Sequence, residues 1–162
     1  MNSNKSLGYS RREWLATAGF SAGAVLLSRR RLFADVDGIV PTMVNAAAIA
    51  KITVQPLRCN ISVLEGSGGN IAVLTGRDGK VLVDAGFAVS REGISNALAS
   101  INSGPVKHLI NSHWHTDHTN GNEWLHAAGA AIVAQETTRK HLSVDTRVEG
   151  WNYTFPDRKS VV

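Results

Sequence analysis

Three histidines and one aspartate fall within six positions of the sequence, in the stretch HWHTDH at residues 113–118. Imidazole nitrogens and carboxylate oxygens without cysteine favour a divalent first-row metal, zinc first, with iron or manganese as alternatives. On a helix, residues two positions apart point to nearly opposite sides, whereas on an extended segment they point the same way. We therefore expect His113 and His115 to lie on an extended segment if they share a metal.

The segments on either side of this stretch predict a strand before it and a helix after it. Residues 106–110 are rich in apolar and β-branched side chains and run directly into the motif, as a strand would. Asn120 is followed three positions later by Glu123, a pattern typical of a capping box. We therefore expect a helix that is capped by Asn120 and ended by Gly129.

The four candidate donors are expected to meet at the carboxyl end of this strand, where α/β sheets often place their sites. His113, His115 and Asp117 would line one face of the extended chain, and the turn into the helix would bring His118 towards them. Two ligand pairs so close together favour two metals that share a hydroxide. A bound metal lowers the pKa of water and so supplies a nucleophile at neutral pH. This chemistry is typical of a hydrolase.

The remainder of the chain from residue 51 predicts a layered α/β domain. Strands are expected at residues 52–57, 61–64, 71–75, 81–83 and 131–134. Helices are expected at residues 88–101 and 136–142. The order of β-hairpins, helix, strand, helix, strand and helix predicts a sheet with helices packed against it. Cys59 is the only cysteine and lies in an apolar stretch, so we expect a buried thiol and no internal disulfide.

The net charge of +4 comes from the first part of the chain. Residues 1–34 hold six basic side chains and one acidic one, whereas the remaining residues hold 11 basic and 12 acidic ones. The domain also has no basic stripe interleaved with aromatic residues, which is the usual sequence pattern of a nucleic-acid interface. We therefore expect no nucleic-acid partner.

Residues 1–34 have the layout of an export signal: a basic start, an apolar run at residues 16–27, and then polar residues. The stretch SRREWL at residues 10–15 resembles the twin-arginine motif. The apolar run is too short to span a bilayer core of roughly 30 Å. We expect the twin-arginine machinery to export the chain to the periplasm or beyond, without a stable membrane span unless the signal stays uncleaved. Cleavage is expected near residue 34 or as late as residue 48, and an amphipathic N-terminal helix or tail is the alternative.

HWHTDH, preceded by VKHLINS and followed by TNGNEW, resembles the signature H-x-H-x-D-H of the metallo-β-lactamase superfamily. The similarity extends back through GNIAVLTGRDGKVLVDAG at residues 69–86 and covers about residues 51–142. The resemblance implies an α/β fold, the N-terminal half of an αββα metallo-β-lactamase sandwich, with a domain at residues 51–162. It also implies zinc as the cofactor, with two ions in the complete site.

The resemblance further implies a role for each candidate residue. His113 and His115 would bind the first metal. Asp117 and His118 would bind the second, and Asp117 would also hold the attacking water, which makes it the catalytic residue. Asp84 would bind no metal but would orient the ligands through hydrogen bonds. A turn-forming aspartate is the alternative for Asp84.

The family completes its site with a histidine, a bridging aspartate and a last histidine from later strands. After His118 this sequence offers His126 and His141, both in predicted helices, and Asp145 and Asp157, with no histidine after them. The chain therefore matches a truncated, N-terminal half of the sandwich. The sheet face that would pack on the second half is expected to be apolar and exposed, which favours association.

Three hypotheses about function follow from these observations. The first is an exported hydrolase whose metal-bound hydroxide attacks an ester, amide, thioester or lactam of a small-molecule substrate. The second is a truncated, catalytically inactive fragment, or a non-catalytic module that acts through its exposed sheet. The third is an iron-dependent persulfide dioxygenase of the same fold. Antibiotic hydrolysis does not follow from the family name, because one fold hosts many reactions.

Overall fold

A computed structural model describes residues 38–158 of the chain. The chain divides into two units, Met1–Asp37 and Gly38–Val162, and the described residues all belong to the second. The expected export signal at residues 1–34 lies outside the described residues. No helix within residues 38–158 combines the length and the apolar character needed to cross a membrane.

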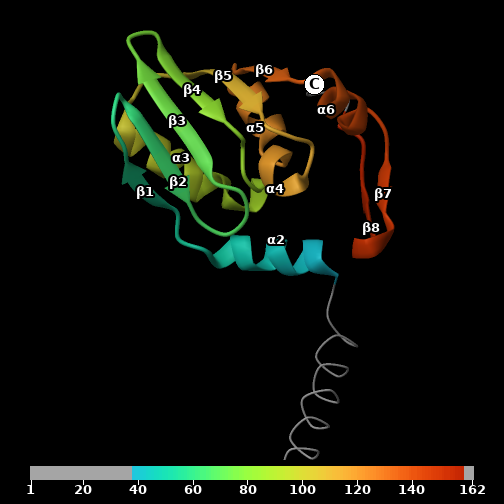
Figure 1. The fold of residues 1–162 in the computed structure, drawn as a ribbon. Coiled ribbons are helices and arrows are strands. Elements are labelled where there is room, and N and C mark those ends of the chain that lie inside the picture. The colour runs from blue at the N-terminus through green and yellow to red at the C-terminus, as the bar shows by residue number, and fades with distance from the viewer. Residues whose placement is uncertain (1–37, 159–162) are drawn as a thin grey trace, which may run out of the picture. The chain divides into compact units, whose positions relative to one another are not determined.

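The described residues form a six-stranded sheet with the strand order β1-β2-β3-β4-β5-β6 (Figure 1). Its strands are β1 (Thr53–Pro56), β2 (Ile61–Glu65), β3 (Ile71–Gly76), β4 (Gly79–Val83), β5 (Val106–Asn111) and β6 (Ala131–Ala134). The strands β1 to β4 pair antiparallel, whereas β4 with β5 and β5 with β6 pair parallel. All the strands predicted from residue 51 onward are present, which confirms the mixed α/β architecture.

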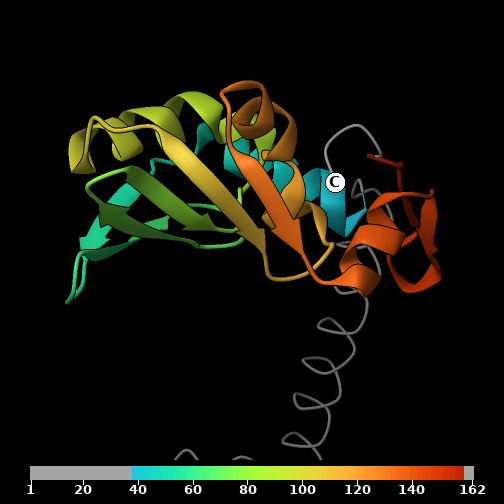
Figure 2. The same cartoon turned by 90° about the horizontal axis from the view of Figure 1, so that it is seen from above.

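Helices cover one face of the sheet (Figure 2). The main connection between β4 and β5 is the 3₁₀ helix η1 (Ala88–Ser90) followed by α3 (Arg91–Ile101), as the helical spacing predicts. Between β5 and β6 the chain forms α4 (Thr116–Thr119) and α5 (Asn122–Ala127). The hydrophobic core lies between this face and the helices, and it includes Val73, Leu82, Leu109, Ile94 and Leu125.

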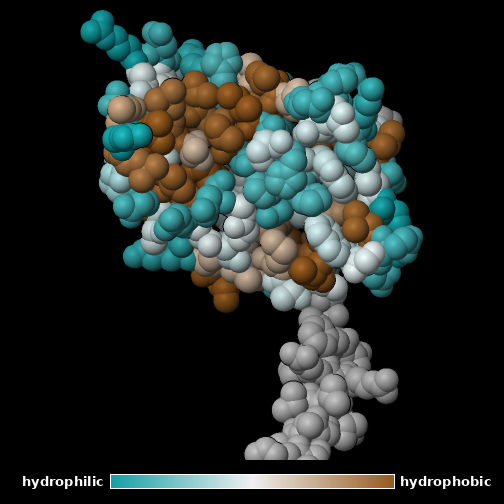
Figure 3. All heavy atoms as spheres, viewed as in Figure 1, coloured by the Kyte–Doolittle hydropathy of each residue, from teal (hydrophilic) through white to brown (hydrophobic). Residues whose placement is uncertain are grey.

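The opposite face of the sheet carries apolar side chains that no described helix covers (Figure 2). The exposed ones are Leu74, Val83, Ile110 and Val133, with 37–52% of each residue accessible. Cross-strand pairs place Val83 beside Ile110 and Ile110 beside Val133, so three of these side chains lie on adjacent strands. Figure 3 shows apolar residues gathered on this face. The expectation of an exposed apolar sheet face is therefore confirmed for the described residues.

One helix and one hairpin were not expected from the sequence. The helix α2 (Ile39–Ile49) contacts η1, and the hydroxyl of Ser90 donates to the carbonyl of Ala47 at 3.0 Å. After α6 (Glu136–Leu142), the chain forms a hairpin of β7 (Thr146–Val148) and β8 (Tyr153–Phe155) around the 3₁₀ helix η2 (Glu149–Trp151). Strands of three residues are too short to display a period, so the sequence pattern does not reveal this hairpin.

The prediction of a buried Cys59 is wrong. The residue is exposed and has a φ of 59°, and Asn60 beside it has a φ of 61°. Two consecutive left-handed residues form the tight turn between β1 and β2, where the chain faces solvent. The apolar character of the neighbouring strands therefore does not extend to the turn that joins them.

Candidate metal centre

The candidate donors follow the end of β5, but they do not share one extended segment, because the chain bends at residues 112–114, which include His113. β5 ends at Asn111, and His115 keeps an extended backbone with φ −63° and ψ 152°. Asp117 and His118 already belong to the short helix α4, which begins at Thr116. The expectation that Asp117 continues the extended face is therefore wrong, because the chain turns into a helix at Thr116, five residues before the predicted start at residue 121.

The predicted capping box is also absent. The N-cap of α5 is Gly121, without a side-chain cap hydrogen bond. The side chain of Asn120 instead accepts a hydrogen bond from the backbone N–H of Ala88 at 2.8 Å and so joins the α4–α5 connection to η1. Gly129, with a φ of 98°, follows the C-cap of α5 and ends the helix as predicted.

The four donors of HWHTDH lie side by side in the structure. His113 Nε2 and His115 Nδ1 are 3.1 Å apart and share a hydrogen bond. The rings of His113 and His118 have centroids 4.0 Å apart. His118 Nε2 lies 3.3 Å from Asp117 Oδ2. The turn from β5 into α4 therefore brings all four predicted ligand side chains into one group.

Asp84 joins this group from the end of β4. Its backbone has a φ of 68°, a left-handed conformation that aspartate tolerates better than most residues. Its Oδ1 accepts from the backbone N–H of Ser112 at 2.8 Å, and its Oδ2 accepts from the Ser112 hydroxyl at 2.7 Å. Oδ2 also lies 2.8 Å from His118 Nδ1. Asp84 thus contacts His118 directly and, through Ser112, fixes the loop that carries His113 and His115.

Two carboxylates bracket the imidazole of His118 and change its protonation. Hydrogen bonds to Asp117 and then to Asp84 raise the pKa of His118 to about 9. Burial opposes ionisation of both carboxyl groups, but hydrogen bonds from His118 and other donors outweigh it and lower the pKa of each. His118 therefore carries a proton at neutral pH in the metal-free chain. A metal ligand must be a neutral imidazole, so a metal would have to displace this proton.

The environment of His115 has the opposite effect. Burial, followed by the charge of His113, lowers the pKa of His115, so its ring is neutral at neutral pH. A neutral imidazole is the form that binds a metal. The group therefore contains one histidine that is ready to bind and one that is held as a cation.

The β2–β3 loop approaches the donors so closely that it has room only for glycine. A Cβ added at Gly69 would lie 2.7 Å from His118 Cε1 and 2.8 Å from the carbonyl oxygen of Asp117. A Cβ at Gly68, which has a φ of 100°, would meet the ring of Phe87 and approach the Cβ of Asp117. The glycine cluster GSGG at residues 66–69 is the local signal of this role, but along the sequence it looks the same as an ordinary turn.

Aromatic side chains from the C-terminal elements lie on the other side of the donors. The ring of Trp151 lies 5.0 Å from that of His115, and the ring of Phe155 lies 5.0 Å from that of Trp114. His141 stacks on Trp114 at 4.7 Å, so its ring does not join the four donors. The hairpin that the sequence did not predict therefore forms one side of the candidate site.

The donor atoms do not yet surround a common point. Within residues 38–158, no group of three or more His, Cys, Asp or Glu side chains is arranged to hold a metal ion. The ring nitrogens are directed at one another and at carboxylates instead. The donor set still fits zinc chemically, because it offers three imidazoles and a carboxylate within one short segment. Binding would require these side chains to turn from one another towards the ion.

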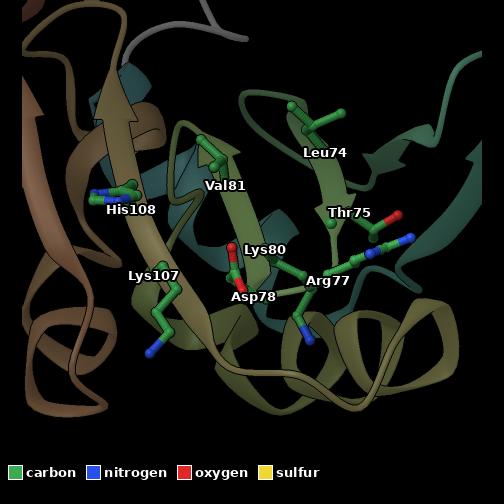
Figure 4. Close-up of a pocket in the computed structure, with 10 residues that line it drawn as sticks. Leu74, Thr75, Arg77, Asp78, Lys80, Val81, Lys107 and His108 are labelled. Carbon is green, nitrogen blue, oxygen red and sulfur yellow. The ribbon is translucent and has the colours of Figure 1, made fainter.

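A cavity of about 310 Å³ lies at the other end of β4 and β5 (Figure 4). It is lined by the turn between β3 and β4 and by the start of β5, including Arg77, Lys107 and His108. None of the four donors lines it. The cavity is therefore separate from the candidate metal centre.

Solved structures with the same fold are metallo-beta-lactamases. The Rm3 metallo-beta-lactamase is 23% identical, with a TM-score of 0.59 over 70% of this chain and 45% of that chain. MEM-A1, a subclass B3 enzyme from a soil metagenome library, is 19% identical, with a TM-score of 0.58 over 68% and 44%. A Cronobacter sakazakii enzyme, the HARLDQ motif mutant S60, is 19% identical, with a TM-score of 0.60 over 70% and 46%. The chain spans less than half the length of these proteins.

No curated protein sequence matches the chain. The model of the metallo-beta-lactamase superfamily, in contrast, matches residues 64–160, which is more than half of the chain and includes HWHTDH. The fold, the strand-end position of the motif and this match agree. The chain belongs to the metallo-beta-lactamase superfamily.

Proposed function

We propose that the chain is part of an exported, metal-dependent hydrolase that acts on an ester, amide, thioester or lactam of a small-molecule substrate. The observation that carries the proposal is the grouping of His113, His115, Asp117 and His118 at the end of β5. Metal-dependent chemistry is further supported by membership of the superfamily. The export pathway rests on the twin-arginine-like stretch at residues 10–15.

His113 and His115 would hold one zinc ion, and Asp117 and His118 a second. Bound zinc would supply an activated water at neutral pH. Asp117 would accept a hydrogen bond from that water and so orient it towards the substrate. Asp84 would keep His118 in place, because its carboxylate already accepts from His118 Nδ1 at 2.8 Å and leaves Nε2 for the metal.

The experiment that tests this function is an assay of the zinc-loaded full chain against esters, amides, thioesters and lactams. We expect turnover that falls by at least about 100-fold, the scale of a lost transition-state interaction, in His115→Ala and Asp117→Ala. The matched control is His108→Ala, because His108 is exposed on β5 and outside the group. Turnover that persists in the two site variants would contradict the proposal.

Metal content separates the hydrolase from an oxygenase of the same fold. A chain that retains zinc and hydrolyses a substrate supports the proposal. A chain that retains iron and consumes oxygen with a persulfide supports the dioxygenase instead. Iron and zinc share imidazole and carboxylate ligands, so the ligand set alone does not distinguish them.

A second candidate function is a non-catalytic module that associates through the open sheet face. The exposure of Leu74, Val83, Ile110 and Val133 on one face is the observation that favours it. Apolar surfaces of this kind mark interaction sites or aggregation-prone faces. Self-association together with hydrolysis no faster than that in buffer would support this candidate over the enzyme.

A further inference from the structure

Arg158 reaches the candidate metal centre from the end of the chain that follows β8. Its Nη1 donates to the hydroxyl of Thr119 at 2.7 Å, and its Nη2 donates to the hydroxyl of Thr116 at 2.9 Å. These threonines are the first and last residues of α4, and both are buried. One guanidinium group therefore connects the two ends of the helix that carries Asp117 and His118.

The connection continues from Thr119 to the segment that carries His115. The Thr119 hydroxyl accepts from Arg158 and donates to the carbonyl oxygen of His115 at 2.9 Å. The backbone N–H of Thr119 also donates to this carbonyl oxygen, at 3.1 Å. Arg158 is thus linked through one hydroxyl to the backbone of a candidate ligand.

Arg158 is itself held in place by the C-terminal elements. Its backbone N–H donates to the carbonyl oxygen of Leu142 at the end of α6, at 2.6 Å. Phe155, at the end of β8, is buried and packs edge-on against Trp114. The contacts of α6 and β8 therefore fix where the backbone of Arg158 lies.

The chemistry of the guanidinium suits this position. Arginine keeps its charge in a partly buried site and offers several donors in a rigid plane, so it can reach two hydroxyls at once. A lysine in its place offers a single ammonium group, which does not match two separated acceptors in the same way. Hydrogen bonds that involve a charged donor contribute more to stability than neutral ones.

We propose that Arg158 is a positioning residue that holds α4 against residues 113–115, so that Asp117 and His118 lie beside His113 and His115 before a metal binds. The inference rests on the proposed function, since it assigns Arg158 to the same metal centre. It predicts that the segment after β8 helps to assemble the group of donors, in addition to the sheet.

The test compares the full chain with Arg158→Met, which keeps an unbranched side chain but removes the N–H groups that donate hydrogen bonds to Thr116 and Thr119. The matched control is Arg147→Met on β7, where Arg147 is exposed and pairs with Glu149. Cobalt(II) affinity is measured by titration and by the absorption bands of the bound ion. Amide hydrogen exchange at residues 116–119 is measured in the metal-free proteins.

We expect Arg158→Met to bind cobalt about 10–100-fold more weakly, the usual effect of losing a residue that orients metal ligands. Its amides at residues 116–119 should exchange faster, whereas Arg147→Met should match the unaltered chain in both measurements. Arg158→Lys should restore part of the affinity. Thr116→Val combined with Arg158→Met should weaken cobalt binding by less than the sum of the two single effects. Each change already removes the hydrogen bond between Arg158 and Thr116.

Unchanged cobalt affinity and unchanged exchange in Arg158→Met would overturn this inference. If Arg158→Met does not fold, the comparison uses Arg158→Lys and Thr116→Val, and unchanged values in both of these variants overturn it equally. Failure of the proposed function has a different outcome: the unaltered chain then binds no cobalt. In that case the exchange rates of the metal-free proteins still decide whether Arg158 holds α4.

Discussion

At the candidate metal centre, Ser112, Gly69 and Arg158 each contact a segment that is distant in the sequence. The four donors and Asp84 are predictable, because their chemical types and spacing are visible along the chain. Ser112, Gly69 and Arg158 are not, because each acts through such a contact. A local sequence pattern does not show which distant residue packs closely against a glycine. Of these three, only Gly69 had a local signal, the glycine cluster.

The close approach of Gly69 to His118 gives the first prediction. Gly69→Ala places a Cβ within 2.7 Å of the His118 ring, a distance that forces the ring or the β2–β3 loop to move. We expect a loss of about 1–3 kcal/mol in the free energy of unfolding, typical of overpacking, together with weaker metal binding. Gly150→Ala is the control, because a Cβ there meets nothing within 4 Å. Chemical denaturation and cobalt titration measure both effects, and equal values for the two variants would refute the steric role of Gly69.

The hydrogen bond between Asp84 and His118 gives a prediction about pH. The folded pKa of His118, about 9, is higher than its ordinary value of 6.5. The stability gained from this cation is therefore fully present below about pH 6.5 and is lost as the pH rises through about 9. Asp84→Asn should lower the pKa of His118 only in part, because Asp117 is the larger cause of the shift.

NMR titration of the His118 ring in the metal-free chain measures this pKa directly. Unfolding experiments at pH 6 and pH 9 then show whether the pH-dependent loss of stability shrinks in Asp84→Asn. Asp78→Asn serves as the control, since Asp78 is exposed in the β3–β4 turn. An unchanged His118 pKa in Asp84→Asn would mean that Asp84 does not act on this imidazole.

At the scale of helices and strands, the long periodic segments were predictable and the short connecting ones were not. The strands β1 to β6 and the helices α3 and α6 lie where the sequence predicts them. α4 has four residues, too few to show a helical period, so the sequence placed Asp117 on extended chain. The capping pattern at Asn120 also failed, because its side chain bonds to Ala88 instead.

The attachment of α5 to β5 depends on two buried amides. Asn111 and Asn122 donate to each other's side-chain oxygens at 3.0 and 2.8 Å, and both are almost fully buried. Removing one amide leaves the other without its partner, so Asn122→Ala should cost about 1–3 kcal/mol in the free energy of unfolding. Asn45→Ala on the exposed side of α2 should change it by less than about 0.5 kcal/mol.

The coupling of this pair is measured by urea denaturation of Asn111→Ala, of Asn122→Ala and of the double variant. The double change should cost less than the two single changes together, because either one already breaks the interaction. Strictly additive costs would show that the two amides do not depend on each other.

At the scale of the whole described unit, the apolar face of the sheet is the dominant surface feature. Its presence was predictable from the family resemblance, since strands that are apolar on both faces need a layer on each side. The actual set of exposed residues was not, because it depends on register: Val83, Ile110 and Val133 share a face only through the observed pairing. β6, the last strand in the order, also leaves one edge unpaired within the described residues.

This face should cause concentration-dependent association of the full chain. Val133→Lys combined with Leu74→Lys places charges on the exposed face and should shift the chain towards the monomer in sedimentation velocity experiments. Ala99→Lys adds a charge on the exposed side of α3 and serves as the control. Association that is equal in all three proteins would show that the open face does not mediate it.

Whether HWHTDH forms a metal centre in this chain is decided by calorimetric titration of the metal-free full chain with zinc. We expect saturable binding of one or two ions per chain, with a loss of at least about 10-fold in affinity in His115→Ala and Asp117→Ala and none in His108→Ala. Zinc binding releases the proton of His118, so the measured heat should depend on the buffer. If the unaltered chain folds but binds no zinc, or if the site variants bind as tightly as the unaltered chain, HWHTDH is not a metal centre.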